Sequence, residues 1–191
     1  MNGAQQRSEA ELVAQAREGN IGSFEQLVER NREVVFRVAA RIVGSDEASD
    51  ISQDAFLRAF NGLPRFSGEG SFRSWLLQIT HNAAVSHVTR RRPEPVDPLG
   101  MEEEDQEAEI GGPAVALEKR DRTKRLETKI RLLRMEHRSV LVLRDVEGLS
   151  YEEIVDATGT PLGSVKGRLH RARQELIDLL RRNTYDWELP E

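Results

Sequence analysis

Apolar side chains recur along this chain at intervals of three and four residues, which is the spacing of amphipathic α-helices. From Phe24 onward, the pattern predicts a helix of about five turns that ends near Gly44. Ser23 precedes the first apolar position and Gln26 follows three residues later. This pair is expected to form a capping box at the start of the helix.

Two further amphipathic patterns follow in the first half of the chain. They predict helices over residues 48–59 and 72–83, separated by a loop over residues 62–70, where glycine and proline are frequent. Residues 126–133 and 140–143 predict two more helices in the second half. No segment shows the alternation of a β-strand, so the fold class is expected to be all-α.

The net charge of −5 is divided unevenly along the chain. Residues 1–92 carry a net charge of +1, and residues 93–118 carry −9 without any basic residue. Residues 119–182 carry +6, and residues 183–191 add three acids. Because charge acts locally, the negative total does not exclude a nucleic-acid partner for the basic segment.

This division predicts two small helical domains. Residues 93–118 are acidic, rich in proline and glycine, and too poor in apolar residues to offset the entropy lost on ordering. We expect them to form a flexible linker between a domain at residues 1–92 and a domain at residues 119–182. Residues 183–191 form an acidic tail, and nothing in the sequence explains its Tyr185 and Trp187.

Several classes of function are excluded by composition. The chain has no cysteine, which excludes disulfide scaffolds, thiolate zinc sites and cysteine nucleophiles. Its four histidines lack ligand spacing, and the usual phosphate-loop, serine-hydrolase and zinc-protease motifs are missing. We expect no metal, no cofactor, no small-molecule substrate and no catalysis. Without a long apolar run or a signal peptide, no membrane insertion and a cytoplasmic location are expected.

The basic segment contains a helix-turn-helix pattern. Ser150 and Glu153 form a capping-box signature for a short helix that Gly159 ends, and Thr160-Pro161 opens the next helix. An ordinary helical hairpin with a solvated basic face is the alternative. On the second helix an apolar stripe is expected to face inward. The candidate DNA-binding residues of this helix are Ser164, Lys166, Arg168, His170, Arg171 and Arg173.

Residues 144–154 and 163–173 resemble region four of bacterial extracytoplasmic-function sigma factors. Residues 47–60 are similar to the segment with which this family docks on RNA polymerase, and residues 65–76 and 79–92 to the part that melts and reads the −10 promoter element. The resemblance extends over almost all of the chain outside the linker and the termini. Two distinct motifs in the expected order are more specific than either motif alone.

The docking segment also has a chemical rationale of its own. Asp50, Gln53 and Asp54 are spaced so that two carboxylates and an amide share one helix face, where they can pair with arginines of a partner. A solvated helix face is the alternative. With Phe56, these residues are the candidates for binding the β′ clamp of core polymerase.

The predicted −10 reader combines aromatic side chains, arginines and a glycine-rich loop. Such groups hold unstacked bases, and a loop can receive a flipped base. Phe72 and Trp75 lie on an apolar stripe, however, and core packing is the favoured role for both. The candidate −10 residues are Arg65, Phe66, Phe72, Asn82, Ser86, Arg90 and Arg91.

Two positions depart from the family pattern. Ser86 stands where family members usually carry an acid, and Gly167 replaces a more usual polar residue in the recognition helix. Promoter preference is therefore expected to differ from that of other members. Gly167 is expected to loosen its helix by up to about 1 kcal/mol relative to alanine.

The resemblance implies an alternative sigma factor that binds the β′ clamp and β subunit of core RNA polymerase and directs it to promoter DNA at the −10 and −35 elements. It also implies an anti-sigma partner, although no residue identifies one. The acidic linker either threads the polymerase channel that RNA later occupies or masks the basic domain. A stand-alone helix-turn-helix regulator and a protein-binding adaptor are the other classes. The regulator does not need the Asp50 face, and the adaptor leaves the basic helix unexplained.

Overall fold

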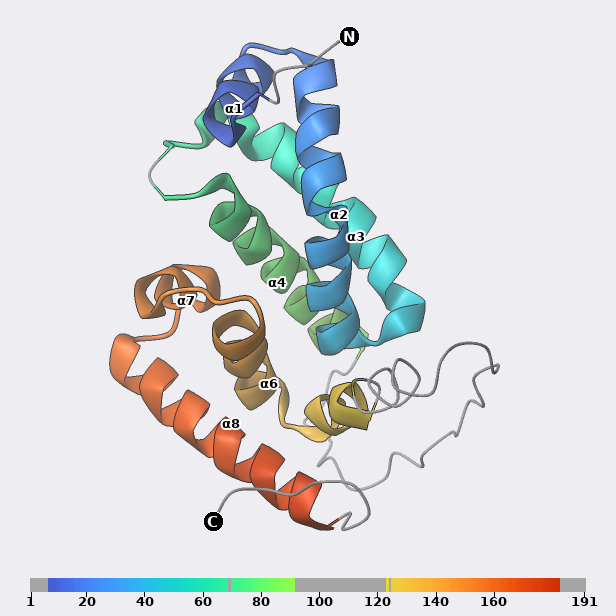
Figure 1. Ribbon diagram of the computed structural model, residues 1–191, viewed down its shortest axis with the longest axis vertical. Coiled ribbons are helices and arrows are strands. Elements are labelled where there is room, and N and C mark those ends of the chain that lie inside the picture. The colour runs from blue at the N-terminus through green and yellow to red at the C-terminus, as the bar shows by residue number, and fades with distance from the viewer. Residues whose placement is uncertain (1–6, 69, 92–122, 124, 183–191) are drawn as a thin grey trace, which may run out of the picture.

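The structure is a computed structural model that describes residues 7–68, 70–91, 123 and 125–182. We call residues 7–91 the N-terminal block and residues 125–182 the C-terminal block. All regular elements within the described ranges are helical (Figure 1), as the sequence predicts. The elements of the N-terminal block are α1 (Glu9–Arg17), α2 (Ile21–Val43), α3 (Ser45–Gly62), the short 3₁₀ turn η1 (Leu63–Arg65) and α4 (Phe72–Arg91). The C-terminal block has helical residues 125–132, α6 (Met135–Leu141), η2 (Val142–Val146), α7 (Tyr151–Thr158) and α8 (Leu162–Arg182). The predicted linker at residues 93–118 and the predicted tail at residues 183–191 lie outside the described residues.

The N-terminal block is a bundle in which α2, α3 and α4 pack side by side. Its core contains fully buried apolar side chains: Leu12, Leu27, Val35, Ala55, Ala59 and Leu76. Leu12 comes from α1, a helix that the apolar pattern does not reveal. Ser8 and Glu11 form a complete capping box at its start, so the signal for α1 lies in its cap rather than in its periodicity.

The predicted start of α2 at Ser23 is wrong. The helix begins at Ile21, and the Asn20 side chain caps it by accepting a hydrogen bond from the Ser23 backbone N–H at 3.0 Å. Ser23 is fully buried, and its hydroxyl donates to Gln15 at 2.7 Å. Asparagine is as good a cap as serine, and it stands at the earlier position. Gly44 ends the helix, as expected.

The helix-turn-helix is confirmed in the C-terminal block. Ser150 and Glu153 form both hydrogen bonds of the capping box at the start of α7, and Gly159 ends that helix in the left-handed conformation, with φ of 62°. The preceding helix differs from expectation, because α6 continues into a π-helical turn, η2, before Gly148 ends it. The α8 helix extends beyond the predicted recognition segment, to Arg182.

The two blocks share one hydrophobic core. Side chains from α2 and α4, including Ile42 and Leu77, belong to the same buried cluster as Leu133, Leu143 and Ile154 of the C-terminal block. In Figure 1, α4 lies between the other N-terminal helices and the pair α6 and α7. Direct packing of the two blocks, which the sequence did not indicate, places α7 of the helix-turn-helix against α4.

Candidate nucleic-acid interface

The recognition helix α8 presents its polar residues as its apolar stripe predicts. Val165, Leu169 and Ala172 are buried against the block, so the remaining side chains are turned outward. Arg168 is half-buried. The exposed candidates are Ser164, Lys166, His170, Arg171 and Arg173.

Three of these cations are held by neighbouring side chains. Arg168 donates to the Thr160 hydroxyl at 3.0 Å and pairs with Glu136 at 3.2 Å, which fixes the turn before α8. The Lys166 ammonium lies 5.5 Å from the centre of the Tyr151 ring. Arg173 forms a bidentate pair with Asp145 of η2. His170 and Arg171 are exposed, and no such partner is found for them among the residues that the structure describes.

A second candidate surface surrounds the loop between α3 and α4. Phe66 and Phe72 are buried there, with ring centroids 6.2 Å apart, and the half-buried Trp75 stacks 4.8 Å from Phe66. The packing role favoured for Phe72 agrees with this burial. The surface around the loop is hollowed by a pocket of about 410 Å³, lined by Arg65, Phe66, Ser67, Trp75, Gln78 and Asp156.

The outer side of α4 continues this surface. Asn82 and Arg90 are exposed and Ser86 is half-buried, at intervals of four residues along the helix. Arg91 is the last residue of the helix. The Asn82 side-chain oxygen lies 3.4 Å from Nδ1 of the neighbouring His81.

His81 is buried where α4 meets α7. Burial lowers the pKa of its imidazole, and this effect outweighs the opposing influence of Asn82 and of the Ala157 backbone. A neutral ring is therefore favoured at the contact between the two blocks. Sequence reasoning assigned no role to this histidine.

The third candidate surface lies on α2 and α3. Asp50 and Gln53 are exposed as predicted, whereas Asp54 is paired with Arg58 at 2.6 Å and Phe56 is half-buried. A mostly apolar groove of about 350 Å³ runs beside them, lined by Arg32, Glu33, Phe36, Ser49, Ser52 and Phe56. Phe36 of α2 and Leu57 and Phe60 of α3 are large apolar residues that are exposed. The sequence signal for Phe36 is its position: it directly follows the buried Val34 and Val35 but does not share the apolar face of α2.

Comparison with known proteins shows the family of this chain. Residues 27–94 match the family model for Sigma-70 region 2, and residues 123–176 match the model for Sigma-70, region 4. The RNA polymerase sigma-H factor of Pseudomonas aeruginosa is 31% identical over 180 residues, which cover 90% of this chain and 93% of that protein. The chain belongs to the sigma-70 family, among its extracytoplasmic-function (ECF) sigma factors.

Other ECF sigma factors are similarly related to this one. The ECF RNA polymerase sigma-E factor of Escherichia coli is 31% identical over 180 residues, covering 91% of this chain and 94% of that protein. The ECF RNA polymerase sigma factor SigE of Mycolicibacterium smegmatis is 34% identical over 163 residues, covering 85% of this chain. This match spans less than two thirds, 63%, of the SigE protein.

Solved structures of other proteins have the same fold as this ECF sigma factor. CnrH in complex with the cytosolic domain of CnrY has a TM-score of 0.68 at 26% identity, covering 92% of this chain and 99% of that chain. The sigma factor RpoE of Bartonella quintana, solved with the anti-sigma factor NepR, has a TM-score of 0.65 at 23% identity. The match covers 84% of this chain and 98% of that chain. Among the described residues, no helix is long and apolar enough to cross a membrane, and no three potential ligands gather into a metal site.

Proposed function

We propose that this ECF sigma factor binds core RNA polymerase, carries it to promoters with a −10 and a −35 element, and helps to open the DNA. The observation that carries the proposal is the presence, in one chain and in this order, of a region 2 bundle and a region 4 helix-turn-helix. A stand-alone regulator needs only the second of these.

The α2–α3 surface is the proposed polymerase site. Asp50 and Gln53 offer an acid and an amide to arginines of the β′ clamp, and the groove beside Phe36 and Phe56 offers apolar area. Asp54 first has to release or share Arg58. Exposed apolar patches rimmed by polar groups are typical of protein interfaces.

The loop pocket and the outer side of α4 are the proposed −10 site. Arg65 and the edge of the Phe66–Trp75 stack suit an unstacked base, while Asn82, Ser86, Arg90 and Arg91 follow the strand along α4. Because Phe66 and Phe72 are buried, we assign Phe72 to shaping the pocket and only the rim of Phe66 to base contact.

The recognition helix α8 is the proposed −35 site. Arg171, His170 and Lys166 are placed to reach bases and phosphates of the major groove, with Ser164 near the helix start. Arg168 and Arg173 are assigned mainly to positioning, since both already hold carboxylates.

The remaining assignments follow from this function. The chain itself performs no catalysis and acts in the cytoplasm together with polymerase, and an anti-sigma factor restrains it. We propose functional domains at residues 1–92 and 119–182, with residues 93–118 as the linker between them and residues 183–191 as a tail.

The proposal is tested by adding the protein to sigma-free core polymerase on genomic DNA and mapping transcript starts. We expect starts that share a −10 and a −35 sequence. Reversing the charge of the docking face with Asp50→Arg should abolish most of them. Glu25→Arg, a matched reversal at the opposite end of the α2–α3 pair, should not. Absence of promoter-specific starts with the wild-type protein would overturn the proposal.

A further inference from the structure

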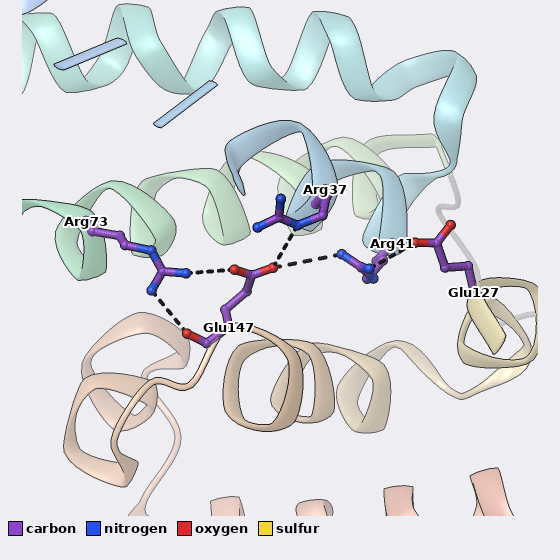
Figure 2. Close-up of polar contacts among 5 residues, drawn as sticks. All are labelled: Arg37, Arg41, Arg73, Glu127 and Glu147. Carbon is purple, nitrogen blue, oxygen red and sulfur yellow. Dashed lines mark hydrogen bonds and ion pairs between the residues drawn. The ribbon is translucent and has the colours of Figure 1, made fainter. Parts of the chain in front are cut away.

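The contact between the two blocks is centred on one buried carboxylate, that of Glu147. Its side chain is only 1% exposed, although it belongs to the turn after η2. Arg73 of α4 donates to its carboxylate at 2.7 Å and to its backbone carbonyl at 3.1 Å. Arg37 and Arg41 of α2 approach the other carboxylate oxygen, at 3.5 and 3.8 Å (Figure 2). Three arginines of the N-terminal block thus converge on one acid of the C-terminal block.

This cluster is incompletely satisfied. Oε1 of Glu147 and two nitrogens of Arg41, Nε and Nη1, are buried without a hydrogen bond of good geometry among the described residues. Arg41 also pairs with Glu127, again an acid of the C-terminal block, at 2.9 Å. Three guanidinium groups present more donors than one carboxylate can accept. The cluster therefore has donor capacity that Glu147 leaves unused.

The packing of α7 against α4, which we call the closed arrangement, also borders the proposed −10 site. The Ser74 hydroxyl of α4 donates to Glu153 of α7, and Gln78 donates to the Asp156 carbonyl at 2.5 Å. Asp156 itself lines the pocket beside Phe66, where its carboxylate would repel a DNA strand. Arg73 directly precedes Ser74 on α4, so the arginine cluster adjoins the Ser74–Glu153 contact.

If the blocks separate, the arginines lose Glu147 and Glu127 together. Three like charges close to one point then attract any available anion, and planar guanidinium groups suit phosphate especially well. For a protein that opens promoters, the anion at this surface is the DNA backbone.

We propose that Arg37, Arg41 and Arg73 form a binding site for a backbone phosphate of the promoter strand, and that Glu147 occupies this site in the free chain as a substitute for the phosphate. The inference rests on the proposed function and deepens it. The free protein is closed by its own C-terminal block, and DNA replaces Glu147 when the blocks separate.

The test uses the full-length protein and a fluorescein-labelled single-stranded DNA of random sequence, with binding followed by anisotropy over a series of salt concentrations. Glu147→Gln keeps the shape of the side chain but removes its charge. We expect its DNA affinity to rise on the order of tenfold, because the binding-competent fraction grows. Glu152→Gln removes an exposed acid from the same block and is the matched control, with an expected change of less than about twofold.

A second substitution distinguishes two roles for Arg73: binding a phosphate, or only holding the two blocks together as a latch. Adding Arg73→Ala to Glu147→Gln should lower DNA affinity and flatten the salt slope by about 0.7, the value for one phosphate contact on a single strand. Arg73 acting only as a latch would give the opposite result, since its removal would open the molecule further and leave affinity unchanged or higher. Arg17→Ala, an exposed arginine of α1, controls for lost charge.

Circular dichroism and small-angle scattering on the same samples establish that each variant is folded and whether it is expanded. The inference is overturned if folded Glu147→Gln neither expands nor gains DNA affinity, or if Arg73→Ala fails to weaken the opened variant. It is also overturned if Glu147→Gln gains affinity for core polymerase but not for DNA, since the arginines would then receive a protein acid. None of these results affects the mapping of transcript starts, so failure here is distinguishable from failure of the proposed function.

Discussion

Arg173 and Asp145 form a bidentate ion pair that ties the recognition helix α8 to the turn η2. Nε of Arg173 lies 2.9 Å from one carboxylate oxygen, and Nη2 lies 2.7 Å from the other. Arg171, two residues earlier, is exposed, and no hydrogen bond or ion pair holds its guanidinium among the residues that the structure describes. Arg173 is therefore assigned to holding α8 in place, and Arg171 to contacting DNA.

The first prediction compares these two arginines. Arg171→Ala should weaken binding to −35 duplex DNA and flatten its salt dependence by about one unit of slope, since a free cation releases a counterion on meeting a phosphate. Arg173→Ala should change the slope less and lower stability by up to about 1 kcal/mol, as expected for a partly exposed pair. Fluorescence anisotropy and urea unfolding measure the two effects. Equal slopes for the two variants would contradict the assignment.

Gly167 gives a prediction about stability. It lies inside α8, and an added Cβ would meet only Arg171 Nη2, at 3.9 Å. Gly167→Ala should therefore stabilise the protein by up to about 1 kcal/mol. Gly159→Ala is the contrasting variant, because φ of 62° at that helix end disfavours alanine and should cost about 1 kcal/mol. Urea unfolding of both variants should give shifts of opposite sign.

The contact between Ser74 and Glu153 reports on the closed arrangement in solution. The hydrogen bond from Ser74 is the largest of several effects that lower the pKa of the Glu153 carboxyl. Ser74→Ala should raise that pKa toward its ordinary value, as followed by NMR titration of the Glu153 side chain. Ser150→Ala should raise it less, because the Ser150 backbone N–H still donates to the carboxylate, and this contact lies within one block. If only Ser150→Ala moves the pKa, the blocks are not closed in the free protein.

His81 makes the contact between the blocks sensitive to acid. Burial lowers its pKa below the ordinary 6.5, so the folded chain keeps the ring neutral while the unfolded chain takes up a proton. The free energy of unfolding should therefore fall as the pH drops below about 6.5, and remain level above it. In His81→Gln this part of the decline should be missing between pH 7.5 and pH 5.5. His170→Gln, an exposed histidine, should leave the decline in place.

Local patterns were sufficient for most of the helices. Apolar periodicity located α2, α3, α4 and α8, and the capping box of Ser150 with Glu153 marked α7. The misplaced start at Ser23 shows the limit of such signals, because two good caps stood three residues apart and only packing decided between them. The π-helical turn at Val142–Val146 has no sequence signature that we recognise.

The contact between the blocks was beyond sequence reasoning for a physical reason. Glu147 precedes a glycine in a polar turn, which predicts an exposed residue, yet partners 74 or more positions away bury it. Periodicity describes which face of an element is apolar, not which distant charge meets it. The exposed residues Asp50 and Arg171 were predictable because their roles depend only on the face of their own helix.

Permanganate footprinting of a promoter found by start mapping tests whether this chain opens promoters as a subunit of polymerase. Permanganate oxidises unpaired thymines and therefore reports strand opening. We expect reactive thymines around the −10 element only when the chain and core polymerase are both present. Opening by core alone, or a chain that binds the promoter while polymerase leaves it closed, would contradict the claim.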